Sequence, residues 1–72
     1  MKKSEIRNKI GLRIKELRVQ HNLTQDKFAL MTGINRSYLA DIEKGHRNFG
    51  FDTLERIVEG FGISYSEFFE GL

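Results

Sequence analysis

Residues Gln25 to Ile42 have the sequence QDKFALMTGINRSYLADI, which is the pattern of two short helices joined by a tight turn. Ala29 lies four residues before Gly33, so a side chain no larger than a methyl group stands where one helix must approach the next. Gly33 can take the positive φ that ends a helix and reverses the chain at little steric cost. Beyond this turn, apolar residues recur at helical spacing, which predicts a helix with one inward face and one outward face.

The outward face of that helix is polar or small, and it begins with an arginine. Its members are Arg36, Ser37, Ala40, Asp41 and Lys44, whereas Ile34, Leu39 and Ile42 are apolar. Helices shorter than about 12 residues are marginal alone, so the rest of the chain must hold this one. A rigidly held surface helix with an arginine near its start is suited to the DNA major groove. A solvated amphipathic helix without a ligand has the same pattern, and only the turn favours DNA.

Seven spaced positions and two flanking motifs define the pattern more closely. They are Gln25, Phe28, Ala29, Gly33, Ile34, Leu39 and Ile42, with LTQ at 23–25 and IEKG at 42–45. The combination resembles the phage-repressor (lambda and Cro-like) helix-turn-helix family. The segments NRSYLADIEKGHRN, FDTLERI and SEFFE make the chain most similar to the controller proteins of restriction-modification systems. The resemblance implies an all-α, compact, five-helix lambda-repressor-like fold, with the helix-turn-helix at about 24–44.

The length and composition limit the other possibilities. Seventy-two residues make a single domain with a thin core, expected here to span residues 1–72. The absence of cysteine excludes a disulfide scaffold, a thiolate zinc site and a cysteine nucleophile. No segment has the apolar run of a signal peptide or the roughly 20 apolar residues that cross a bilayer. We therefore expect a cytoplasmic protein with no membrane partner.

The charge is distributed unevenly along the chain. The net charge is only +2, which is weak support for nucleic acid by itself. Acidic residues gather in the last third, at Glu55, Glu59, Glu67 and Glu70. The first two thirds are therefore basic, and they contain the helix-turn-helix.

A first helix is expected from a cap at Ser4 to about Gln20. Its apolar stripe consists of Ile6, Ile10, Ile14 and Leu17. Gly11 weakens this helix by up to about 1 kcal/mol relative to alanine, which close packing against another element would explain. Arg18 lies near the inward face, and the family resemblance implies a structural ion pair between Arg18 and Glu43.

The C-terminal third predicts two more helices. Asp52 is expected to cap a fourth helix, with Glu55 completing a capping box. The inward residues of that helix are Leu54, Ile57, Val58 and Phe61. Ser64 and Glu67 form a second capping box, which opens a short last helix.

The expected DNA contacts fall into two groups. Base edges are expected to meet the start and outward face of the third helix, at Arg36, Ser37, Tyr38, Ala40 and Asp41. Phosphates are expected to meet helix N-termini and the loop after the third helix, at Thr24, Gln25, Asn35, Lys44, Arg47 and Asn48.

Individual side chains in these groups differ in what they can select. Arg36 can give guanine O6 and N7 two parallel hydrogen bonds, worth about 1–3 kcal/mol of discrimination. Tyr38 offers a ring to a thymine methyl and a hydroxyl to a phosphate, and Asp41 either accepts from cytosine N4 or only repels phosphates. The amide of Gln25 can donate to a phosphate beside a helix N-terminus, where the helix dipole also favours anions.

Aromatic residues crowd the C-terminus beyond what one small domain can bury. We expect a homodimer interface at Tyr65, Phe68, Phe69 and Leu72. Alternatively, Phe68 closes the core and Phe69 lies unpaired on the surface. A two-fold dimer would place two recognition helices about 34 Å apart, so that it would bind a pseudo-palindrome.

Two departures from the family pattern have no assigned role. Leu30 and Met31 replace residues that are usually polar, and they either widen the core under the first helix or form an interaction patch. Phe49 stands where proline is common, so the path of its loop is less certain than the helices.

The sequence thus predicts a sequence-specific, dimeric, DNA-binding transcriptional regulator. The resemblance implies control of restriction-modification genes, with RNA polymerase as a further partner at the promoter. An antitoxin of the same fold, which masks a toxin, is the alternative. We expect no enzyme, catalytic residue, metal, cofactor or small-molecule ligand, because no nucleophile has a neighbouring histidine and His21 and His46 lack companions at metal-ligand spacing.

Overall fold

Five helices follow one another in residues 5–70 and 72, the part of the chain that the computed structural model describes. They are α1 (Glu5–Gln20), α2 (Gln25–Thr32), α3 (Arg36–Glu43), α4 (Phe51–Phe61) and α5 (Tyr65–Phe69), and these described residues form no strand. The predicted all-α, five-helix fold is confirmed. The expected cap at Ser4 lies outside the described residues. None of the described helices is both long enough and apolar enough to span a bilayer.

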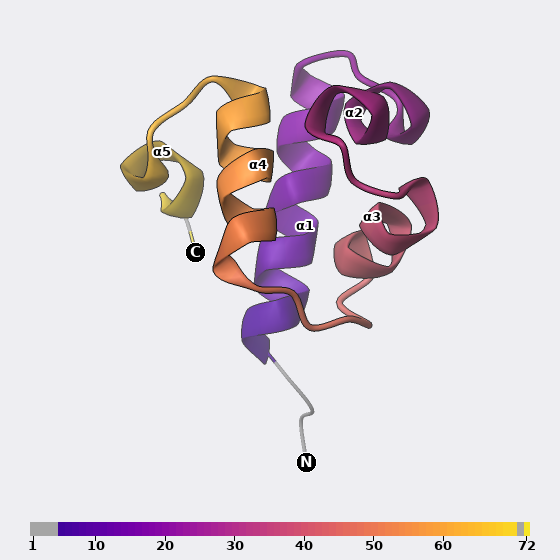
Figure 1. The fold of residues 1–72 in the computed structure, drawn as a ribbon. Coiled ribbons are helices and arrows are strands. Elements are labelled where there is room, and N and C mark those ends of the chain that lie inside the picture. Colours follow the sequence, from indigo (N-terminus) through magenta and orange to yellow (C-terminus); the bar gives the residue numbers. More distant parts are fainter. Residues whose placement is uncertain (1–4, 71) are drawn as a thin grey trace.

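Two helices form the centre of the molecule, and the other three flank them. Figure 1 shows α1 and α4 side by side, with α2 and α3 on one flank and α5 on the other. The rings of Phe28 (α2) and Phe61 (α4) stack with their centroids 4.3 Å apart. The fully buried side chains come from all five helices: Ile14, Phe28, Leu39, Ile42, Ile57, Val58 and Phe68. Burying each such side chain stabilises the fold by about 1.5–3 kcal/mol.

Local capping fixes the turn between α2 and α3. The Thr24 hydroxyl accepts a hydrogen bond from the backbone N–H of Lys27 (3.1 Å) and begins α2. Gly33 ends that helix with φ +72°, in the left-handed region. The Asn35 side-chain oxygen then accepts from the backbone N–H of Tyr38 (3.1 Å) and begins α3. Each end of the turn therefore has the cap that its sequence predicted.

The apolar stripe of α1 is shorter than predicted. Ile6 is 57 % exposed and Ile10 is only half-buried, whereas Ile14 and Leu17 are buried. The first turn of α1 extends past the end of α3 (Figure 1), so little of the protein covers it. The expectation that Ile6 belongs to the core is therefore wrong.

The predicted capping box of α4 is also wrong. The helix begins at Phe51, one residue earlier than expected, and Gly50 is its N-cap without a side-chain hydrogen bond. Asp52 lies inside the first turn, where its carboxylate does not cap the helix but interacts favourably with the helix dipole. In contrast, Ser64 and Glu67 form the expected capping box of α5, with both hydrogen bonds present.

Close contact between α1 and the end of α3 explains Gly11. A Cβ atom at Gly11 would lie 2.4 Å from the carbonyl oxygen of Ile42 and 2.7 Å from that of Glu43. Both atoms belong to the backbone of a helix, so neither can move aside cheaply. Only glycine lets the two helices approach this closely.

Gly11→Ala should therefore destabilise the protein. Overpacking of this kind costs about 1–3 kcal/mol, which outweighs the gain in helix propensity of about 1 kcal/mol. Thermal unfolding followed by circular dichroism should show a fall in Tm of several degrees. Gly50→Ala is the control: a Cβ there would meet no atom within 4 Å, so this variant carries only the smaller cost of alanine at an N-cap. If the two variants unfold at the same temperature, the close approach at Gly11 does not limit stability.

Candidate nucleic-acid interface

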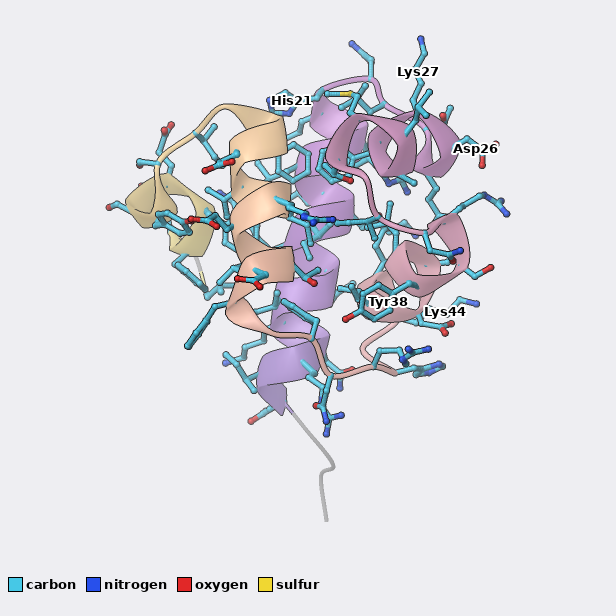
Figure 2. The ribbon with its side chains drawn as sticks, viewed as in Figure 1. His21, Asp26, Lys27, Tyr38 and Lys44 are labelled. Carbon is cyan, nitrogen blue, oxygen red and sulfur yellow. The ribbon has the colours of Figure 1, made fainter. Side chains whose placement is uncertain are left out.

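The start of α3 faces solvent, as a DNA-reading helix requires. Ser37 is exposed, and so is 61 % of the Arg36 side chain. The Arg36 guanidinium forms an ion pair with the carboxylate of Asp26 on α2, whose side chain is also largely exposed. In Figure 2, Asp26 points outward from α2. Such a surface pair contributes at most about 1 kcal/mol, so Arg36 can exchange it for another partner.

Tyr38 occupies a different position from Arg36 and Ser37. Its hydroxyl donates to the backbone carbonyl of Asn48 (3.3 Å), and the Arg47 guanidinium lies 4.8 Å from the centre of its ring. Figure 2 shows Tyr38 pointing from α3 toward the start of α4. The ring therefore holds the loop after α3 and positions Arg47. The expected contact of Tyr38 with a base stays a prediction. To make it, Tyr38 would have to give up its contacts with Asn48 and Arg47.

Ala40 and Asp41 are both half-buried in the middle of α3. Asp41 lies 3.6 Å from the Arg47 guanidinium, which offsets part of the repulsion that the carboxylate would exert on phosphates. Ala40 lines a groove between α3 and α1, away from the start of the helix. Base contacts by these two residues stay predictions, and the structure gives them less support than it gives Arg36 and Ser37.

The expected phosphate contacts lie on both sides of the start of α3. Lys44, Arg47 and Asn48 are exposed at and beyond the end of the helix. Thr24 and Asn35 already use their side-chain oxygens as helix caps, so only the Thr24 hydroxyl hydrogen and the Asn35 amide hydrogens can reach a phosphate. Lys44, Arg47 and Asn48 are therefore more accessible to a phosphate than the two capping residues, although Arg47 also contacts Asp41 and the ring of Tyr38.

A hydrogen-bonded network behind α3 joins three helices. Arg18 Nε donates to Glu43 Oε2 (2.7 Å), Nη2 donates to Oε1 (3.1 Å), and Nη1 donates to the carbonyl of Leu23 (2.7 Å). The side chains of Arg18 and Glu43 are 11 % and 3 % exposed. The structure therefore contains the ion pair that the family resemblance implied, and the pair links α1 to the last residue of α3.

The same network changes the expectation for Gln25. Its side-chain amide donates to Glu43 Oε1 (3.0 Å), and the residue is half-buried. The amide expected to donate to a phosphate is thus partly occupied, because it satisfies a buried carboxylate. One amide hydrogen and the backbone N–H at the start of α2 are still able to meet a phosphate.

The predicted dimer interface needs a correction at Phe68. This side chain is fully buried in the protein's own core, so a second chain cannot contact it. The reason is Arg13 of α1, which donates to the backbone carbonyls of Glu67 and Phe68, each at 2.7 Å, and holds α5 against α1. Leu72 is partly exposed but lines a separate hollow with Leu12.

Tyr65 and Phe69 instead belong to an apolar surface that continues onto α4. Phe51 is 88 % exposed, and it lines one hollow with Leu54 and Tyr65. Tyr65 also lines the next hollow with Phe69. We call these four residues the α4–α5 apolar face. Phe51 was not among the predicted interface residues, although it precedes Leu54 by three residues and helical spacing places the two on one face.

Acidic side chains surround this face and are kept away from α3. Asp52, Glu55 and Glu59 lie on α4, with Glu67 and Glu70 in and after α5. Figure 1 places α5 on the flank opposite α3. Desolvation, together with the charges of Glu55 and Glu59, raises the pKa of Tyr65, so this phenol stays neutral near pH 7. In the described part of the chain, no three His, Cys, Asp or Glu residues are grouped so that they could hold a metal.

Comparisons with known proteins agree with this geometry. The helix-turn-helix family profile matches residues 14–68. Control protein C.MunI from a Mycoplasma species is 36 % identical over 70 residues, which cover 96 % of this chain and 95 % of that protein. Control protein C.BamHI from Bacillus amyloliquefaciens is 33 % identical over 61 residues, which cover 83 % and 75 %.

Solved structures extend the likeness to three dimensions. C.Esp1396I bound to a 25 base pair operator site superposes with a TM-score of 0.87 at 32 % identity, covering 94 % of this chain and 90 % of that one. The same restriction-modification controller protein has been solved as a tetramer in complex with its natural 35 base-pair operator, with a TM-score of 0.88 and the same identity and coverage. The predicted resemblance to controller proteins is confirmed.

Removing Arg18 should destabilise the fold strongly. Arg18→Met should cost about 3–5 kcal/mol, because Glu43 would be left as an uncompensated buried charge. Urea unfolding measures this loss, with Arg36→Met as the control, whose exposed ion pair contributes at most about 1 kcal/mol. The double variant Arg18→Met/Glu43→Met should recover much of the stability. Equal losses from Arg18→Met and Arg36→Met would show that the buried network is not a stabilising element.

Proposed function

The chain belongs to the helix-turn-helix family, and we propose that it is a transcriptional regulator that binds a pseudo-palindromic operator as a homodimer and controls restriction-modification genes. The relatives that it matches over most of their length are control proteins, which are regulators and not enzymes. One observation supports the proposal most directly. The start of α3 is exposed, while the rest of that helix is fixed from behind by the core and by the Arg18–Glu43 pair.

Arg36 is the side chain best placed to select a base. It lies at the first position of α3, and its present partner Asp26 is exposed, so little energy is lost when the guanidinium leaves that carboxylate. Two parallel hydrogen bonds to guanine O6 and N7 would then be worth about 1–3 kcal/mol in each half-site. Ser37 beside it can contact any base and selects less.

Phosphate contacts would fix the position of α3 in the groove without selecting a sequence. Lys44, Arg47 and Asn48 provide these contacts beyond the end of α3. The N-terminus of α2, with Thr24 and Gln25, provides them on the other side. The contact of Tyr38 with Asn48 and Arg47 supports this arrangement, because it holds the loop before DNA arrives.

The α4–α5 apolar face is the proposed dimer interface. Covering an exposed phenylalanine such as Phe51 contributes about 1.5–3 kcal/mol, and the neutral phenol of Tyr65 can be buried without removing a charge from water. Phe69 extends the face, whereas Phe68 and Leu72 do not belong to it. C.Esp1396I forms a tetramer on its operator. We propose that this chain likewise binds DNA as pairs of copies.

RNA polymerase and a cytoplasmic location belong to the same proposal. Leu30 and Met31 are 83 % and 55 % exposed, which rules out a wider core under α1. They lie on α2, beside the recognition helix, and would stay accessible with α3 in the groove. Polymerase bound at the same promoter is the proposed contact.

A cytoplasmic location is proposed because the relatives that match most of the chain are control proteins of bacteria, whose DNA lies in the cytoplasm.

Arg36→Ala should abolish the preference for the operator and keep most of the general affinity for DNA. A duplex selected by the wild-type protein from a random-sequence pool serves as operator, and a scrambled duplex serves as non-operator. Binding titrations should show a loss of about 1–3 kcal/mol per half-site on the selected duplex only. Lys27→Ala removes the same charge from a side chain that points away from α3 (Figure 2) and should keep the preference. Equal losses on both duplexes would mean that Arg36 contacts only phosphate.

Phe51→Glu should give a folded monomer. A glutamate in the first turn of α4 is compatible with the helix dipole, but a charge at the centre of an apolar interface would disfavour pairing. Sedimentation velocity measures the change, with Leu30→Glu as the control at an equally exposed apolar residue on another surface. A dimer that persists in Phe51→Glu and dissociates in Leu30→Glu would place the interface on α2. A wild-type chain that is monomeric alone would favour the antitoxin alternative.

A further inference from the structure

A groove between α1 and α3 opens beside the proposed DNA interface. Its walls include Asn8 and Lys15 of α1, Gln25 at the start of α2, Ala40 near the middle of α3, and Lys44 and His46 just beyond its end. Its volume is about 690 Å³, and it is open to solvent. Neither Asn8 nor Lys15 belongs to the helix-turn-helix itself, and no contact with DNA has been assigned to α1.

The charges in this groove favour an anion. Its one carboxylate, Glu43, is buried and bonded to Arg18 and Gln25, so it adds no net negative charge. Lys15 and Lys44 are both exposed, and within residues 5–70 and 72 neither forms an ion pair. Two lysines therefore line a groove whose one acid is already neutralised, and Leu12 and Ala40 contribute apolar surface to it.

The position of the groove indicates which anion it would bind. Gln25 and Lys44 come from two different elements, both are proposed phosphate contacts, and both line this groove. A DNA strand that met both residues would pass across it. Lys15 lines the side of the groove that α1 forms. Its long, flexible side chain lets the ammonium group reach a phosphate from an exposed position.

We propose that this groove is a phosphate-binding site for the DNA backbone, in which Lys15 of α1 acts together with Lys44. The inference rests on the proposed DNA-binding function and extends it to a helix outside the helix-turn-helix. The contact would add affinity on every sequence and would not select bases. It would also make binding more sensitive to salt, because each phosphate that is neutralised releases condensed counterions.

Lys15→Gln tests the proposal, with Lys9→Gln as its matched control. Both variants remove one positive charge from an exposed residue of α1, but Lys9 lines a different hollow, which contains Glu16 and Glu70. Binding of the selected and scrambled duplexes should be titrated between about 50 and 200 mM salt. Lys15→Gln should lower affinity for both duplexes by the same factor and reduce the slope of log K against log salt by about 1. Lys9→Gln should keep the wild-type slope, and both variants should unfold at the wild-type temperature.

The possible outcomes separate this inference from the function on which it rests. A wild-type slope in Lys15→Gln, or the same change in both variants, would overturn the groove as a phosphate site. The regulator proposal would still stand if Arg36→Ala lost its preference in the same titrations. If Lys15→Gln lowered affinity for the selected duplex alone, Lys15 would contact a base, and this result would also overturn the groove as a phosphate site. If the wild-type protein prefers no duplex, the proposed function and this inference both fail.

Discussion

The ion pair between Arg18 and Glu43 is the interaction on which the arrangement of the first three helices depends. A carboxylate as buried as Glu43 is tolerated only with a partner, and it receives hydrogen bonds from Arg18 and from Gln25. Arg18 also binds the carbonyl of Leu23, at the connection before α2. One charge pair therefore fixes the end of α3 relative to α1 and to the start of α2. Because this network uses one hydrogen of the Gln25 amide, that residue has a structural role before it has any role with DNA.

Backbone contact between α1 and the end of α3 also fixes the position of α3 and determines which of its sides faces solvent. At Gly11 the two helices approach so closely that the end of α3 rests directly on α1. Leu39 and Ile42 bury the inner side of α3 at the same place. With one end and one side fixed, the helix cannot rotate, and its first turn must face solvent. The exposure of Arg36 thus follows from contacts that lie at the opposite end of its helix.

The molecule separates two surfaces of different chemistry. The side that carries α3 presents the exposed cations Arg36, Lys44 and Arg47, and Lys15 of α1 lines the groove next to it. The far side, on α4 and α5, is apolar at Phe51 and Tyr65, with carboxylates around it. The two carboxylates on the α3 side, Asp26 and Asp41, each pair with an arginine, which reduces their repulsion of phosphates. This separation is what the proposed DNA interface and the proposed dimer interface require.

Local signals in the sequence determined the helices, because a cap or a turn depends only on residues within about four positions. The left-handed turn at Gly33 and the cap at Asn35 could be predicted for this reason, and the family pattern added the pairing of Arg18. Only the tertiary structure decided which aromatic residue is buried. Phe68 and Phe51 look equivalent in the sequence, yet the first is enclosed and the second is exposed. Exposure depends on which distant element covers a residue, and spacing along the chain does not contain that information.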